Sequence, residues 1–168
     1  MKIKNCLTRY TFVQWRFFFS ISLNKYKHYF RILNFKSPLM TVKVDTKERF
    51  HVITIQEPVL AANMTEAVSK LLLWHLTLHV KNVVLNLADV REIDPAVAAR
   101  ITEIQQKFYD AHCSLVICGL QSRVERFLDA AELLELMNVV PTESEAGDII
   151  QMEEIERELG QGPDQPAG

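Results

Sequence analysis

Cysteine and glycine are both scarce in this chain of 168 residues. The cysteines are odd in number and scattered, so they form neither a disulfide framework nor the paired spacing of a zinc ribbon; they are Cys6, Cys113 and Cys118. We therefore expect a reducing compartment, the cytoplasm. Of the five glycines, three fall between positions 160 and 168, so the sequence has no glycine-rich loop that could cradle a phosphate.

Acidic residues are absent from the first 39 positions. Eight of the 19 basic residues lie there and none of the 21 acids, which gives +8 for this segment and −10 for the remainder. The uncharged run over 17–24 is too short to span a membrane, and Arg16 interrupts the apolar core that a signal peptide needs. Because the remainder of the chain is acidic, we do not expect nucleic acid as a partner.

Aromatic residues follow the same division, since ten of the 15 precede Met40. Two parts of such different composition are not expected to share one core. We predict that residues 1–39 are an extension upstream of the natural start, Met40, and lie outside the folded domain. The alternatives are a tail that binds an anionic membrane surface and an organellar transit peptide.

A regular alternation of strand and helix patterns begins at Met40. Strands are predicted over 41–45, 50–55, 82–88, 114–118 and 138–140. Helices are predicted from Asn63 to about His79, from Asp94, from Ser122, and from Thr142 to about Leu159. The order β-β-α-β-α-β-α-β-α predicts an α/β domain over 40–159, with parallel strands joined by right-handed crossovers. Residues 160–168 are expected to form a disordered tail.

The predicted helix starts differ in strength. Asp94 and Pro95 give the clearest one, with Asp as the N-cap and Pro at the first helical position. Asn63 and Glu66 loosely resemble a capping box, whereas Thr142 and Glu145 have the capping-box signature. The apolar stripes expected to face the core are Val97, Ile101, Ile104 and Phe108 in one helix and Ile149, Met152, Ile155 and Leu159 in the last.

Two motifs in this order resemble the STAS fold, the domain of bacterial anti-sigma-factor antagonists. The first runs from Val83 to Asp94: an apolar strand, a short loop, and an Asp that opens the next helix. The second is the strand and Gly-Leu turn of 115–120, followed by an amphipathic helix with Val124 and Leu128. The resemblance covers about residues 40–159 and implies a mixed sheet of about five strands covered by four helices.

The resemblance also implies a function, partner switching in the regulation of transcription. In this family the unmodified domain binds a kinase-type anti-sigma factor, and phosphorylation of a Ser or Thr at the helix start breaks the complex. Here the matching segment is Asp94-Pro95-Ala96-Val97, so Ala96 has no oxygen to phosphorylate. Thr102 lies about two turns from the N-cap and does not match the motif. We therefore expect no phosphorylation site and a binding module without catalytic residues or cofactor.

The expected partner-binding residues surround this helix start: Arg91, Asp94, Pro95, Ala96 and Ala99. Residues 57–63, before the first helix, are expected at the same end of the domain. Other possibilities are an accessory subunit of a lipid or other ABC transport ATPase, and a small-ligand-binding regulatory domain or enzyme. His75 and His79 have a spacing that can bind zinc, but we expect two unrelated helix residues and no metal. The sequence does not predict the oligomeric state.

Overall fold

The computed structural model describes residues 28–32 and 40–160; our expectations for 1–27, 33–39 and 161–168 lie outside the described residues. The main sheet has six strands in the order β1-β2-β3-β5-β7-β8. These strands are β1 (His28–Ile32), β2 (Met40–Thr46), β3 (Phe50–Ile55), β5 (Asn82–Asn86), β7 (Leu115–Cys118) and β8 (Val139–Val140). A separate two-stranded ladder joins β4 (Val59–Leu60) and β6 (Glu92–Ile93).

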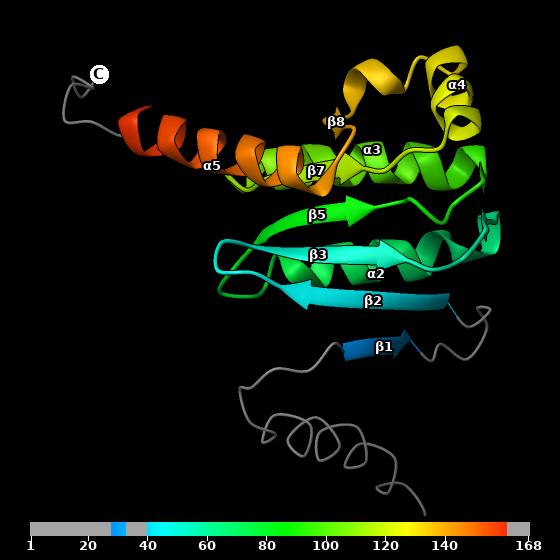
Figure 1. The fold of residues 1–168 in the computed structure, drawn as a ribbon, viewed down its shortest axis with the longest axis horizontal. Coiled ribbons are helices and arrows are strands. Elements are labelled where there is room, and N and C mark those ends of the chain that lie inside the picture. Colours follow the sequence, from blue (N-terminus) through cyan, green and yellow to red (C-terminus); the bar gives the residue numbers. More distant parts are fainter. Residues whose placement is uncertain (1–27, 33–39, 161–168) are drawn as a thin grey trace, which may run out of the picture.

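Helices connect the strands in the predicted order (Figure 1). The α-helices are α2 (Thr65–His75), α3 (Pro95–Asp110), α4 (Ser122–Ala130) and α5 (Glu143–Gly160), and the 3-10 turns are η2 (Ala62–Met64) and η3 (Leu134–Leu136). The sheet pairs antiparallel from β1 to β3 and parallel from β3 to β8. The predicted α/β class is confirmed. The sequence analysis predicted no strand at β1, which lies in the basic segment, or at β4 and β6, which have two residues each and carry no periodicity of their own.

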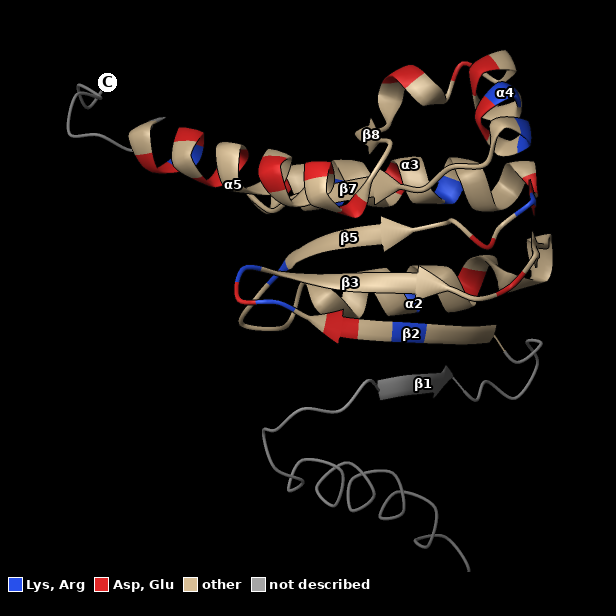
Figure 2. Ribbon diagram, in the orientation of Figure 1, with Lys and Arg blue, Asp and Glu red and all other residues tan. Residues whose placement is uncertain are grey.

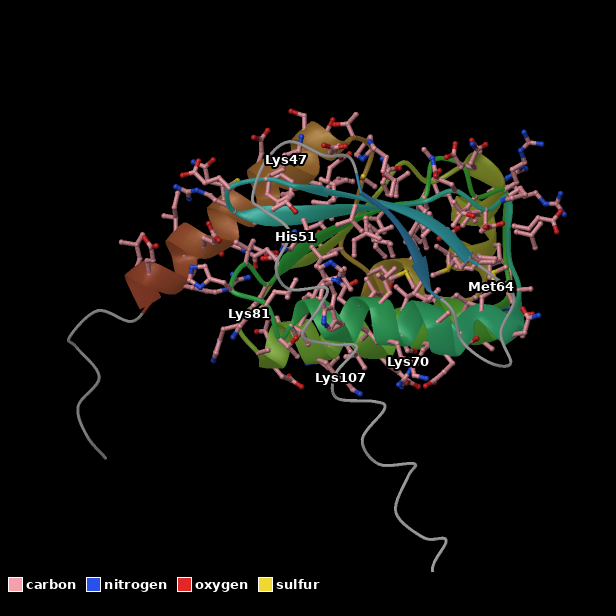
Figure 3. The ribbon with its side chains drawn as sticks, turned by 90° about the horizontal axis from the view of Figure 1, so that it is seen from below. Lys47, His51, Met64, Lys70, Lys81 and Lys107 are labelled. Carbon is pink, nitrogen blue, oxygen red and sulfur yellow. The ribbon has the colours of Figure 1, made fainter. Side chains whose placement is uncertain are left out.

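Helices cover both faces of the sheet, α2 and α3 on one side and α5 on the other (Figure 3). Alternation along β3 separates the two cores: Ile53 and Ile55 face the larger core with α2 and α3, whereas Val52 packs with Ala146 and Ile150 of α5. The central strands are therefore buried on both sides. This explains why β5 and β7 read as continuous apolar runs in the sequence.

The start of α3 is as predicted, and that of α2 is not. Asp94 is the N-cap of α3, and all four residues of its predicted stripe are buried. In contrast, α2 has Met64 at the N-cap position without a side-chain hydrogen bond, because Asn63 lies inside the preceding 3-10 turn. The helix also ends at His75, so His79 lies beyond it.

Helix α5 corrects the predicted apolar stripe. Ile149 packs on the sheet, but Met152, Ile155 and Leu159 are 57%, 45% and 76% exposed. The second half of α5 instead turns polar side chains inward, toward the amino ends of β5 and β7. We call these residues the amino-edge cluster: Asn82, Ser114, Asn138, Glu153, Glu154 and Arg157.

Hydrogen bonds join this cluster across the edge of the sheet. Arg157 Nη2 donates to Ser114 Oγ at 2.6 Å and to Glu153 Oε2 at 3.0 Å. Asn138 Nδ2 donates to the other oxygen of Glu153 at 3.1 Å. Asn82 Nδ2 donates to Glu154 Oε1 at 2.7 Å, so α5 is bound to the starts of β5, β7 and β8. The acid-rich stretch from Glu153 to Glu158 is therefore partly structural.

Two histidines lie buried between β3 and the end of α2. The ring centroids of His51 and His75 are 5.2 Å apart. His75 Nδ1 donates to the Leu71 carbonyl at 2.7 Å, which leaves Nε2 as a buried acceptor without a partner. Burial lowers the pKa of both imidazoles, and in each case outweighs a backbone hydrogen bond that raises it. His75 therefore pairs with His51 rather than with His79, and the fold favours both rings neutral.

We predict that this pair makes stability fall in mild acid. The pKa of each histidine is lower in the folded state than in the unfolded chain. The contribution of the pair to the free energy of unfolding should therefore be complete above about pH 7 and be lost as the pH drops below ~6.5. Urea unfolding between about pH 5 and 7.5 measures this slope. His75→Phe should reduce it, leaving the contribution of His51, whereas the control His79→Gln, at an exposed position, should not change it. Equal slopes in all three proteins would contradict this assignment.

We also predict that a chain beginning at Met40 is as stable as the full chain. Strand β1 pairs antiparallel with β2, from His28 opposite Val44 to Ile32 opposite Met40, but it is an edge strand. The two melting temperatures should agree within about 2 °C, less than the shift that 1 kcal/mol gives in a domain of this size. A larger loss on truncation would show that the first 39 residues stabilise the domain.

Candidate functional site

The start of α3 lies at the carboxyl ends of the parallel strands. Asp94 Oδ1 accepts a hydrogen bond from Ala96 N at 2.9 Å, which satisfies one of the amide groups that a helix start leaves unpaired. The Asp94 carbonyl accepts from Val97 N and Ala98 N, both at 3.0 Å. Pro95 has no N–H, so the amides in the first turn of α3 have their hydrogen bonds within the helix start. This turn therefore presents side chains rather than free amides.

The β4–β6 ladder places residues 57–63 beside this helix start. Arg91 N donates to the Pro58 carbonyl at 2.8 Å, and Asp94 N donates to the Leu60 carbonyl at 2.8 Å. Val59 stands opposite Glu92 in the register. Two loops that are about 30 residues apart in the sequence thus form one surface. It lies at the end of the domain where the sequence analysis expected both loops.

The residues predicted to bind a partner lie together and face outward. Arg91, Pro95, Ala96 and Ala99 are exposed, and Asp94 is half-buried because it caps the helix. Ala96 and Ala99 are three residues apart, so they lie on the same face of α3. Val59 is 44% exposed and extends this apolar area onto the neighbouring ladder. We call these six residues the α3-start surface.

Two residues that the sequence analysis did not select border this surface. Arg123, in the first turn of α4, forms an ion pair with Glu92 at 2.8 Å, and Gln121 Nε2 donates to the Ala88 carbonyl at 2.6 Å. Both contacts join residues more than 30 positions apart, so no local pattern could have indicated them. Together they hold the start of α4 against the loop that leads into α3.

Gly119 provides the sharp turn that brings α4 to this position. Its φ of +72° favours glycine, and a Cβ there would lie 2.9 Å from Asn86 Oδ1. The same Asn86 oxygen accepts a hydrogen bond from Ala88 N at 3.0 Å, at the end of β5. The Gly-Leu turn of the sequence motif therefore requires glycine, because the ends of β5 and β7 lie close together there.

Cys113 and Cys118 are buried thiols with raised pKa values. Burial raises the pKa of Cys113, and it raises that of Cys118 to about 11, so neither thiol is an activated nucleophile. Both cysteines are free. Within 28–32 and 40–160, no group of three or more His, Cys, Asp and Glu side chains has a geometry that could hold a metal ion. No helix in that part of the chain is both long and apolar enough to cross a membrane.

Comparison with known proteins agrees with this architecture. The family model described as STAS domain matches residues 41–146. A search of curated protein sequences finds no match. Among solved structures, a proposed anti-sigma factor antagonist from Thermotoga maritima is similar with a TM-score of 0.56 and 19% identity, over 64% of this chain and 92% of that one.

Two further solved structures have the same arrangement. An anti-sigma factor antagonist from Mycobacterium paratuberculosis gives a TM-score of 0.59 at 12% identity, over 67% of this chain and 94% of that one. The anti-sigma factor antagonist SpoIIAA in its unphosphorylated form gives 0.54 at 15% identity, over 66% and 96%. At identities this low, the structural likeness shows a shared fold and nothing more.

Proposed function

The chain belongs to the STAS domain family, as its motifs predicted, and from this we propose that it docks a protein partner through the α3-start surface. In this proposal the chain is a bacterial, cytoplasmic regulator of transcription. Its partner is an anti-sigma factor of the serine-kinase type. Binding changes the partner's availability, and this chain itself makes or breaks no bond.

The observation that carries the proposal is the exposed, small apolar face at the first turns of α3. Ala96 and Ala99 leave the helix backbone accessible to close approach, and Val59 adds apolar area beside them. Charged side chains surround this face, among them Arg91 and the Glu92–Arg123 ion pair. An apolar centre within a polar rim is the usual anatomy of a protein–protein interface.

Control of this docking is proposed to differ from that of the family, because Ala96 cannot be phosphorylated. The hydroxyl next along the helix belongs to Thr102, whose Oγ1 donates to the Ala98 carbonyl at 3.2 Å. That hydrogen bond turns the hydroxyl toward the helix backbone. We therefore propose that the partner is bound constitutively at this surface, and that release depends on a change in the partner.

Substituting Ala96 by Glu should abolish docking. A carboxylate would place charge at the centre of the apolar face, whereas at the second position of a helix it favours the folded state. The affinity for the anti-sigma factors encoded in the same genome, measured by calorimetry, should fall at least about tenfold, or ~1.4 kcal/mol. Ala130→Glu, at an exposed position in α4, is the matched control and should bind as the parent does.

Two other results would decide against parts of this proposal. Unchanged affinity of Ala96→Glu would show that the start of α3 is not the interface. If the anti-sigma factors fail to bind while a transport ATPase binds through the same surface, docking stands and the role in transcription fails.

Restoring a hydroxyl at the helix start should restore modification. Ala96→Ser places an exposed Oγ one residue beyond Pro95, at the position that the family phosphorylates. Incubated with the partner kinase and ATP, this variant should yield a phosphopeptide from residues 91–110, detected by mass spectrometry, and the parent protein should not. A phosphopeptide from this region of the parent, at Thr102 in particular, would sink the idea of an unmodifiable surface.

A further inference from the structure

The outward face of α5 carries an apolar seam. Met152, Ile155 and Leu159 follow one another at spacings of three and four, and all three side chains are exposed. This is the a-d-a spacing by which one helix pairs with another. Asp148 occupies the preceding d position, so the seam begins at Met152. Such a stripe on the solvent side of a helix is typical of helix-docking sites.

Carboxylates flank the seam. Glu156 and Glu158 take the e and g positions beside Ile155 and Leu159, and both are exposed. Neither forms an ion pair within the part of the chain that the structure describes. Figure 2 shows how acidic residues dominate α5. Because e and g charges set partner choice, a second copy would bring carboxylates against carboxylates, and an anionic membrane would repel this face.

A cavity of about 400 Å³ opens along the Glu156 side of the seam, between α5 and the end of α3. Tyr109, His112 and Glu156 are among its lining residues, and Tyr109 is 76% exposed. Gln105 also lines it, and its Oε1 is buried without a hydrogen-bond partner. A long basic side chain entering from the seam would find the Glu156 carboxylate as an acceptor.

The amino-edge cluster makes α5 a rigid platform. Glu153 and Arg157 bind the sheet edge from the inner side of the helix, and Arg49 Nη1 pairs with Glu154 Oε2 at 3.2 Å. The inner side is thus occupied by the sheet and the outer side is left for a partner. A preorganised helix loses little freedom on binding, which favours docking even on a short seam.

We propose that the outward face of α5 docks a basic amphipathic helix of a second protein. The partner helix would place apolar residues on Met152, Ile155 and Leu159 and Lys or Arg beside Glu156 and Glu158. The cavity beside the seam is lined by Tyr109, near the end of α3, whereas Ala96 lies in its first turn, about 20 Å away along the helix at 1.5 Å per residue. The inference does not rest on the proposed function, and both surfaces can be occupied together.

A pair of synthetic coiled-coil peptides tests this proposal on the full chain. Both have three heptads with Ile at a and Leu at d; one has Lys at e and g and the other has Glu. Fluorescence anisotropy should show binding of the Lys peptide and at least about tenfold weaker binding of the Glu peptide. The double variant Glu156→Lys, Glu158→Lys should bind the Glu peptide more tightly than the Lys peptide. Ile155→Gln should weaken the binding of either peptide. Val59→Gln, in the α3-start surface, is the control and should leave the affinity for each peptide unchanged.

Four outcomes would overturn the proposal. Binding that the charge reversal and Ile155→Gln leave unchanged would show that the peptide contacts another face. A dimer in sedimentation that Ile155→Gln dissociates would assign the seam to a second copy. Tighter peptide binding by a chain that begins at Met40 would show that the basic segment of this same chain competes for the seam. Equal affinity for the Lys and Glu peptides would remove the charge selection.

Discussion

Parallel pairing of β3, β5 and β7 is the constraint on which the rest of the structure depends. Parallel neighbours cannot be joined by a tight turn, so each connection must cross the sheet through a helix. Every crossover begins at the carboxyl end of a strand, and this places the loops before α2, α3 and α4 at one edge. The α3-start surface exists because these three connections meet there.

The same constraint explains the opposite edge. Asn82 already bonds the Arg49 carbonyl and the Ser114 amide, but α5 covers the amino ends of β5 and β7, so the Ser114 hydroxyl and the Asn82 amide need further hydrogen bonds there. Glu153, Glu154 and Arg157 supply these bonds, so the inner face of α5 is apolar at Ala146 and Ile150 and polar one turn later. The remaining apolar residues of α5 therefore face solvent. A structural requirement at the sheet edge thus creates an unoccupied seam.

The two surfaces suit different kinds of contact. The start of α3 offers small side chains over a capped backbone, which suits the close approach of the partner that we propose. The outer face of α5 offers long side chains with acidic flanks, where a partner helix is selected by charge. The two surfaces belong to different helices, so the two proposed contacts do not use the same residues.

Local patterns alone determined the start of α3, the Thr142 cap at the start of α5, the buried strands and the family, since each depends on neighbouring residues. The predicted surface residues also came from one contiguous segment. Only the tertiary structure decided that α2 ends at His75, that His75 meets His51, that Arg123 pairs with Glu92, and which side of α5 faces the sheet. In α5 both an apolar and a polar stripe fit the helical period, and the choice between them depends on Asn82 and Ser114, which are distant in sequence.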